Sequence, residues 1–181
     1  LIGCTGESII GSNMEIEQAP AVSLWLAKMP GVNVLPFAMG MGEISLAGDL
    51  NDWTIRTGAS PDRQPYFIVL PEPFTSDFKK TLEALNETYE GSTIFGGVPS
   101  AGGPGENLLF YNDQVRDEGL VGIALEGDIE VQAVVSQGCR PIGPGRTAET
   151  SFTDILNGTC SDQYLQDLAF HGSPIRLFGK P

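Results

Sequence analysis

Residues 66–95, YFIVLPEPFTSDFKKTLEALNETYEGSTIF, contain the pattern that decides the fold. The first five residues are an unbroken apolar run, which is typical of a strand covered on both faces. After a proline-bounded break, apolar residues recur at helical spacing up to a stop at Gly91: Phe78, Leu82, Leu85 and Tyr89. Thr75 or Ser76 is available to cap the start of this helix. A second strand follows at 92–95, so the stretch predicts a βαβ unit with parallel strands and a right-handed crossover.

The sequence before this unit predicts several short strands. Residues 1–11 form two apolar stretches around a glycine turn, and residues 21–27 alternate well enough for a further strand. A Pro-Gly break separates that stretch from a return strand at 32–37. Residues 38–65 lack clear periodicity, and we expect a loop-rich connection with one short helix around Trp53.

Strand patterns also dominate the sequence after the unit. Apolar stretches lie at 107–111, 120–125 and 129–135, and Gly127-Asp128 is suited to a two-residue hairpin between the last two. We expect a final helix capped by Ser161. Together these elements predict an α+β fold with mixed parallel and antiparallel β-sheets, a βαβ unit, and helices covering the sheets.

The charge balance excludes some classes of function. Acidic residues number 23 against 10 basic residues, which gives a formal net charge of −13. Nucleic-acid binding depends on Lys and Arg neutralising phosphates, so a nucleic-acid partner is not expected. No stretch approaches the ~20 apolar residues that span a bilayer, and there is no signal-peptide pattern, so no membrane contact is expected.

Cysteines and metal-ligating residues are scarce. Three cysteines, Cys4, Cys139 and Cys160, are widely spaced and odd in number, which fits a reducing cytoplasm better than a disulfide framework. The sequence has no Cys-x-x-Cys pair, no His pair and no EF-hand loop. We therefore expect a cytoplasmic protein with no metal and no cofactor.

Residues 136–144, SQGCRPIGP, closely resemble the signature of FIST domains, named for F-box and intracellular signal transduction proteins. Other stretches resemble the family in the same order: GCTG at 3–6, FIVLPEPF at 67–74, GGVPS at 96–100 and GLVGIALEG at 119–127. The family usually has Ala-Asp where this chain has Pro71-Glu72.

The resemblance runs from Leu1 to about Gly145 and implies a single FIST N-terminal domain over residues 1–181. The family carries a first strand and helix ahead of the Gly-Cys turn, and these are missing here. We therefore expect a fragment of the domain, in which residues 146–181 are a divergent C-terminal extension.

The resemblance also implies a function. FIST domains are proposed to sense small ligands, amino acids among them, and are joined to signalling modules in bacteria and to a ubiquitin-ligase F-box in eukaryotes. We expect a non-enzymatic sensory domain whose partners are a small polar ligand and a signalling or ubiquitin-ligase protein. The alternative is an interaction scaffold without a ligand, for example one that recruits substrates to an F-box ubiquitin ligase. An enzyme that uses Cys139 is the least favoured class.

Seven residues are candidates for ligand binding: Gly138, Cys139, Arg140, Glu72, Gly96, Gly97 and Ser100. The guanidinium of Arg140 is a planar fork suited to a carboxylate; the alternative is a salt bridge within the protein or capping of strand-end carbonyls. The double-glycine loop follows a parallel strand, and ligands often bind at the carboxyl ends of such strands. The alternative for the loop is a turn that needs positive φ.

Glu72 follows the other parallel strand of the βαβ unit. It either binds a ligand amine, opposite Arg140 for the carboxylate, or is a solvated acid. Cys139 follows Gly138, and the neighbouring cation favours a thiolate, but a cysteine nucleophile also needs a base. His171 is the only histidine and lies outside the matched region, so packing at a tight turn is the simpler interpretation of Cys139.

Overall fold

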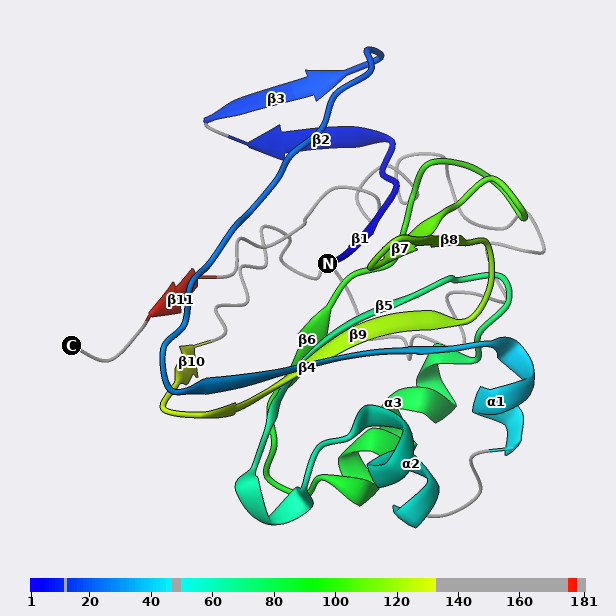
Figure 1. Ribbon diagram of the computed structural model, residues 1–181. Helices are drawn as coiled ribbons and strands as arrows, with labels where there is room; N and C mark the ends of the chain where they lie inside the picture. The colour runs from blue at the N-terminus through cyan, green and yellow to red at the C-terminus, as the bar shows by residue number, and fades with distance from the viewer. Residues whose placement is uncertain (12, 47–49, 133–175, 179–181) are drawn as a thin grey trace, which may run out of the picture. The chain divides into compact units, whose positions relative to one another are not determined.

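The computed structural model describes residues 1–11, 13–46, 50–132 and 176–178. The chain divides into two compact units, one of Leu1–Val131 with Leu177–Pro181 and the other of Gln132–Arg176. The elements that position the candidate site belong to the first unit, which is built around a four-stranded sheet (Figure 1).

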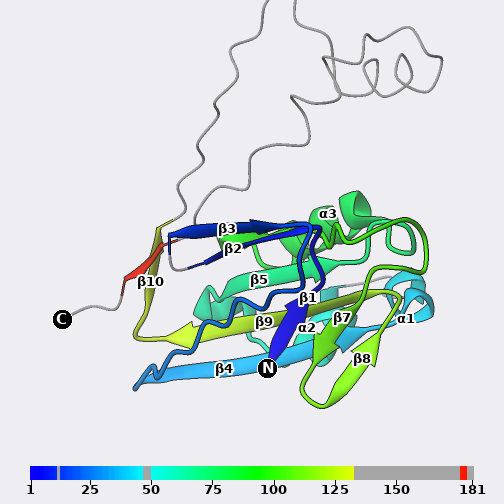
Figure 2. The same cartoon turned by 90° about the horizontal axis from the view of Figure 1, so that it is seen from above.

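This central sheet has the strand order β4-β9-β5-β6. β4 (Val32–Met39) and β5 (Tyr66–Pro71) both pair antiparallel with β9 (Leu120–Gly127), and Figure 2 shows the three strands side by side. β6 (Ile94–Gly96) pairs parallel with β5. The mixed sheet and its parallel pair confirm the predicted fold class.

Helices gather on one side of the central sheet (Figure 1). They are α1 (Met41–Leu46), α2 (Leu50–Thr57), the 3-10 helix η1 (Pro61–Arg63) and α3 (Phe78–Thr88). The predicted helix around Trp53 is therefore confirmed as α2, and the predicted crossover helix as α3. The region between 38 and 65 contains more helix than the sequence indicated.

The hydrophobic core lies between the central sheet and these helices. Phe67 and Val69 of β5 are buried with Trp53 of α2, with Leu85 of α3 and with Tyr89, the residue that caps the end of α3. Burial alternates along β5, so every second residue is only partly buried. No residue of the strand is exposed, so both faces are covered as predicted, the helix-covered face more completely than the other.

The start of α3 lies one residue beyond the predicted cap. Asp77 is the N-cap, and its side chain accepts from the backbone N–H of Lys80 at 3.2 Å. The hydroxyls of Thr75 and Ser76 instead donate to Glu72, one to its carboxylate and the other to its carbonyl. Asp77 then satisfies a helix N–H that has no partner within the helix.

Two other sheets of the first unit are smaller than the central one. β1 (Ile2–Cys4), β7 (Leu109–Tyr111) and β8 (Gln114–Arg116) form an antiparallel sheet in the order β1-β7-β8. β2 (Ser8–Gly11) pairs with β3 (Met14–Glu17) in a hairpin. The two predicted strands within residues 1–11 are confirmed, whereas the sequence did not predict β3 and β8.

One strand prediction and one hairpin prediction are wrong. Residues 21–27 form no strand, and the large apolar side chains among them are exposed. Alternation describes side chains only, whereas a strand also needs a neighbouring edge for its backbone hydrogen bonds. The hairpin at Gly127-Asp128 does not form either: β9 pairs with β4 and β5 on its two edges, and β10 (Glu130–Gln132) pairs with β11 (Arg176–Phe178).

Some expectations fall on other parts of the chain. The final helix after Ser161 lies outside the described residues. Within the described ranges, no helix has the length and apolar character needed to cross a membrane.

Candidate functional site

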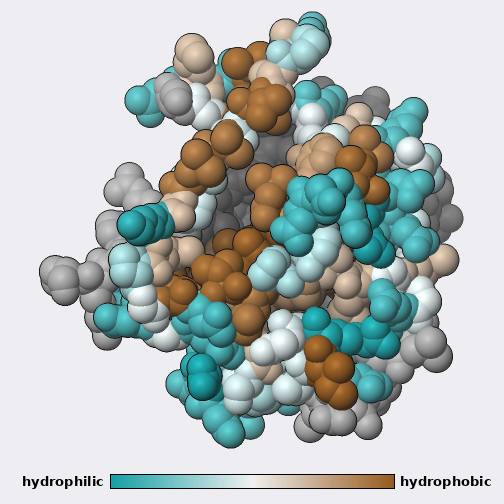
Figure 3. Space-filling view, in the orientation of Figure 1, coloured by the Kyte–Doolittle hydropathy of each residue, from teal (hydrophilic) through white to brown (hydrophobic). Residues whose placement is uncertain are grey.

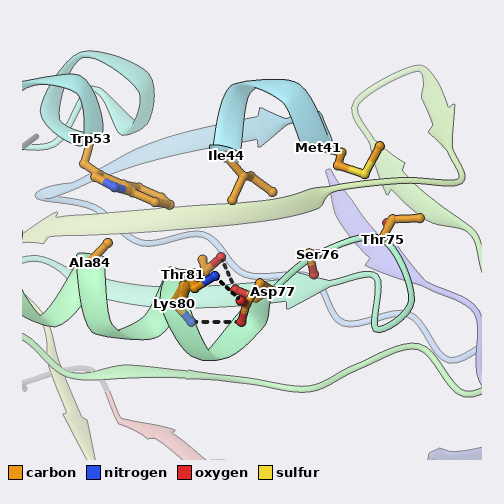
Figure 4. A pocket seen from close by; sticks show the side chains of 9 residues that line it. All are labelled: Met41, Ile44, Trp53, Thr75, Ser76, Asp77, Lys80, Thr81 and Ala84. Atoms are coloured by element: carbon orange, nitrogen blue, oxygen red, sulfur yellow. Dashed lines mark hydrogen bonds and ion pairs between the residues drawn. The ribbon is translucent and has the colours of Figure 1, made fainter. Parts of the chain in front are cut away.

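A pocket of about 350 Å³ lies between α3 and the helices α1 and α2; we call it the α3 pocket (Figure 4). Its apolar wall consists of Met41, Ile44, Trp53 and Ala84. α1 and α2 contribute the first three of these residues, and α3 contributes the alanine. A volume of this order suits a small metabolite, since ligand pockets start at about 300 Å³.

The polar wall of the α3 pocket comes from the turn before α3 and from its first helical turns: Thr75, Ser76, Asp77, Lys80 and Thr81. The Lys80 ammonium and the Asp77 carboxylate form an exposed ion pair at 3.0 Å. Hydrogen bonds from the side chain and the backbone N–H of Lys80 lower the pKa of Asp77. The pocket therefore presents both a negative and a positive group beside an apolar surface.

Trp53 is the one lining residue with an unused buried donor in the part of the chain that the structure describes. Its side chain is 2% exposed, and its indole Nε1 has no hydrogen-bond partner. In Figure 4 the indole ring extends from α2 into the pocket, with Ala84 of α3 below it. A buried donor without an acceptor is unusual and calls for an explanation.

A second, more apolar pocket of about 210 Å³ lies on the other side of α3, next to the double-glycine loop; we call it the glycine-loop groove. Gly96 and Gly97 line it, as does Val98. A Cβ on Gly96 would collide with the carbonyl of Val69, whereas a Cβ on Gly97 would meet nothing within 4 Å. Gly96 is thus required by the close approach of β5 and β6, while Gly97 leaves open space.

Glu72 lies at the end of β5 and is completely buried. Its Oε2 accepts from the backbone N–H groups of Phe74 and Thr75, at 2.8 and 2.7 Å, and from the Thr75 hydroxyl at 2.8 Å. Its Oε1 accepts from Nδ2 of Asn107 at 3.2 Å. Glu72 is therefore not a solvated acid, and a ligand amine at this carboxylate would have to displace one of four donors.

Asn107 connects the Glu72 carboxylate to the loop that follows the double glycine. This side chain is 1% exposed, and its Oδ1 accepts from the backbone N–H groups of Ala101 and Gly102 at 2.9 and 3.3 Å. Ser100 lies beside the opening turn of the chain instead: its N–H donates to the carbonyl of Thr5, and its Oγ accepts from a backbone N–H of the same turn. The structure thus joins Glu72 through an amide to the loop at 101–102, beyond the double glycine, and not to Gly96 or Gly97 themselves.

Of the seven candidates from the sequence, Gly138, Cys139 and Arg140 lie outside the described residues, as does His171. Their proposed roles stay predictions. Among the described residues, no group of three or more His, Cys, Asp or Glu side chains is arranged to hold a metal ion.

Four residues of this region were not among the candidates from the sequence: Trp53, Asp77, Lys80 and Asn107. A usable signal existed only for Asp77, because Asp is a preferred N-cap residue and stands directly before the helical pattern. Asn107 is the first residue of the stretch at 107–111 and looked like the start of a strand. Its role comes from a contact with a residue 35 positions away, which no local pattern encodes.

Comparison with known proteins gives one family and several relatives. The family model described as FIST N domain matches residues 1–156. The Uncharacterized protein Rv0628c of Mycobacterium tuberculosis is 38% identical over 149 residues, which cover 79% of this chain and 36% of the relative. The Uncharacterized protein Mb0898c of Mycobacterium bovis is 35% identical over 146 residues, with the same coverage of 79% and 36%. The chain thus spans about a third of the length of these curated relatives. No solved structure matches the chain.

Proposed function

The chain belongs to the FIST N domain family, a family of signal-transduction sensory domains, and from this premise we propose that it binds a small zwitterionic ligand, such as an amino acid, in the α3 pocket. The observation that carries the proposal is the pairing of Asp77 and Lys80 at the mouth of a pocket with an apolar wall. An amino acid carries one positive and one negative group, which can pair with the negative and the positive group of the pocket. Its ammonium would meet Asp77, its carboxylate would meet Lys80, and its side chain would lie against the apolar wall.

The exposure of the ion pair sets the expected strength of binding. The side chains of Lys80 and Asp77 are 79% and 52% exposed, and exposed charge pairs contribute little because water and salt screen them. Most of the binding free energy must then come from the apolar wall. We therefore expect a weak ligand that is released easily, as suits a sensor whose occupancy follows the concentration of a metabolite.

The turn from 72 to 77 offers a route from ligand to output. Thr75 and Ser76 line the α3 pocket and also donate to Glu72. The Glu72 carboxylate is in turn held by Asn107, which fixes the loop at 101–102. A ligand that prefers one position of this turn would shift the population of conformers in both segments. A signalling partner that contacts either segment would then read the occupancy of the pocket.

A thermal-shift screen against the common amino acids tests the proposal. A ligand at 100 times its Kd stabilises the native state by about 2.7 kcal/mol, or roughly 5–10 °C for a chain of this size. The shift should become smaller in Lys80→Gln and stay unchanged in the matched control Lys79→Gln, because Lys79 is the neighbouring residue and does not line the pocket. A cooperative melt that no compound moves would refute the proposal.

The same screen distinguishes the α3 pocket from the site expected around Arg140. If Arg140→Ala abolishes the shift and Lys80→Gln leaves it intact, the ligand carboxylate is held by Arg140 and the α3 pocket is not the site. The reverse result supports the α3 pocket.

A second function, that of an interaction scaffold, has one observation in its favour. Val22, Leu24, Trp25 and Leu26 form an exposed apolar segment between β3 and β4. Figure 3 shows apolar side chains along the path that this segment takes in Figure 1. Contiguous exposed apolar surface often marks a protein contact. If no ligand stabilises the chain, a defined partner whose binding is lost in Leu24→Ser and Leu26→Ser, with the melt unchanged, would support this function.

A further inference from the structure

β6 is an edge strand of the central sheet, because among the described strands it pairs only with β5. The carbonyl of Thr93 accepts from β5, and the N–H of Gly97 donates to β5. Successive residues of a strand direct their backbone groups to opposite edges, so those of Ile94 and Gly96 point away from β5. An open edge of this kind is a template on which another strand can pair.

An apolar groove lies beside this open edge. The glycine-loop groove is lined by Phe78 and Leu82 of α3 and by Val98 of the loop after β6, and all three side chains are exposed. Gly96 and Gly97 also line it and add no side chains that would fill it. A strand that paired with β6 would lay every second side chain toward the groove, which is how extended segments gain specificity at a sheet edge.

The segment at 21–27 has the alternating pattern of a strand but pairs with none of the described strands. It lies between β3 and β4 (Figure 1), and Val22, Leu24 and Leu26 are exposed there. In an extended chain these three side chains share one side, because successive side chains alternate. The described part of the chain thus contains a strand-like segment without an edge and an edge without a strand.

The segment cannot pair with β6 of its own chain while its junction with β4 is closed. β4 and β6 are opposite edges of the central sheet, so three strand spacings, about 14 Å, separate them. Two hydrogen bonds fix the junction at the β4 edge: the N–H of Val32 donates to the carbonyl of Met29, and the N–H of Asp128 donates to that of Gly31. The segment of a second copy can approach β6 without opening its own junction.

Charges at the ends of the segment favour one direction of pairing. Glu90 is exposed in the turn between α3 and β6, near the start of β6. Lys28 directly follows the segment, and Glu17 precedes it at the end of β3. Antiparallel pairing brings Lys28 toward Glu90, whereas parallel pairing would bring Glu17 toward it. Opposite charges on neighbouring strands stabilise pairing and like charges oppose it, so the antiparallel direction is favoured.

We propose that two copies of the chain form a reciprocal dimer, in which residues 21–27 of each copy add as an antiparallel strand to β6 of the other. Val22, Leu24 and Leu26 fill the glycine-loop groove of the other copy. The same contact occurs twice, so a twofold axis closes the dimer. The exposed segment thus binds a second copy of the chain and not a different protein, and this assembly does not depend on the ligand proposed for the α3 pocket.

Sedimentation velocity on the full chain over a series of concentrations tests the dimer. The monomer has a mass of 19.3 kDa, and we expect a species of twice that mass. Leu24→Ser combined with Leu26→Ser alters the segment, and Leu82→Glu places a charge in the groove. Each change should weaken the dimer about tenfold or more. The matched control Ile55→Glu, at an exposed apolar position of α2 outside the groove, should leave it unchanged.

Mixing the two variants distinguishes this arrangement from other dimers. The segment variant retains its groove, and the groove variant retains its segment. An equimolar mixture should therefore regain a dimer, which is weaker than that of the wild type because only one of the two contacts is intact. Lys28→Glu should weaken the wild-type dimer roughly twofold to fivefold, and an unchanged affinity would overturn the antiparallel direction.

Three results would overturn the proposal. The first is a wild-type chain that stays monomeric at every concentration. The second is a dimer that Leu82→Glu leaves intact, because the segments would then contact another surface. The third is a mixture of the two variants that stays monomeric. Each variant should melt cooperatively at the temperature of the wild type. If Leu82→Glu unfolds the chain, Gly97→Glu alters the same groove at a position where a Cβ meets open space.

Discussion

Replacing Asn107 by alanine removes the amide that holds the Glu72 carboxylate and the loop at 101–102 together. The substitution takes away the donor to Oε1 of Glu72 and the acceptor of two backbone N–H groups. Glu72 and Asn107 are both buried, so water does not replace these bonds without rearrangement. The loss of a hydrogen bond to a charged group is about 1.5–3 kcal/mol, and an unmet donor adds about 1 kcal/mol or more.

We therefore expect Asn107→Ala to lower the free energy of unfolding by about 4 kcal/mol. For a chain of this size the melting temperature falls by roughly 8–16 °C. Urea denaturation followed by circular dichroism measures the change, provided that the slope of the transition stays that of the wild type. Asn86→Ala is the matched control, because Asn86 is exposed on α3 and the same substitution there should change stability by less than about 0.5 kcal/mol.

If Asn107→Ala lowers the free energy of unfolding by less than about 1 kcal/mol, the reasoning is refuted, because Asn107 is then not needed to keep the carboxylate buried. Asn107→Asp sharpens the test by replacing the donor with a second carboxylate facing Glu72. Two carboxylates at hydrogen-bond distance repel each other when both are ionised. The aspartate variant should be less stable than the alanine variant at pH 7, and the difference should shrink at acidic pH, where one shared proton restores a donor.

Three further predictions follow from the same unit. Gly96→Ala should destabilise the chain strongly in urea because a Cβ there meets a β5 carbonyl, whereas Gly97→Ala should be nearly neutral because its Cβ meets open space. Lys80 lowers the pKa of Asp77. The ionised carboxylate therefore contributes stability above its ordinary pKa of about 3.8, and this contribution is lost as the pH falls through the lower pKa of the folded state. The difference in free energy of unfolding between the wild type and Asp77→Asn, measured from pH 7 to pH 2, should therefore close at the acidic end. Burial raises the pKa of the Cys4 thiol, so iodoacetamide should modify Cys4 slowly in the native chain at neutral pH and quickly in urea.

The sequence predicted well those elements whose signal is local. The unbroken apolar run at 66–70 and the helical spacing from Phe78 to Tyr89 each report a single element, and both elements formed where expected. Strand pairing is not local, which is why residues 21–27 were misjudged. The same holds for Gly127-Asp128, where the turn chemistry was suitable but both edges of β9 were taken by β4 and β5.

The candidate site was predicted only in part, for the same physical reason. Glu72 stood out as an acid at the end of a strand, but its burial and its four donors depend on a turn and on a loop 35 residues away. The sequence did not predict the α3 pocket because its walls come from three helices, two of which lie in the region with the weakest periodicity. Trp53 looked like an ordinary core residue, and only the surroundings of its nitrogen set it apart.

The buried carboxylate of Glu72 explains how two loops of this unit form as one structure. Among the described residues that contact it, every hydrogen-bond partner is an uncharged donor, so the charge is tolerated only while these donors are in place. Three of the donors belong to the turn that lines the α3 pocket, and the fourth is held by the loop beyond the double glycine. Moving either segment alone removes donors from the buried carboxylate and leaves its charge poorly solvated. Because of this free-energy cost, movement of one segment alone is less favourable than movement of both together. A ligand that moves the turn would for this reason also move the loop.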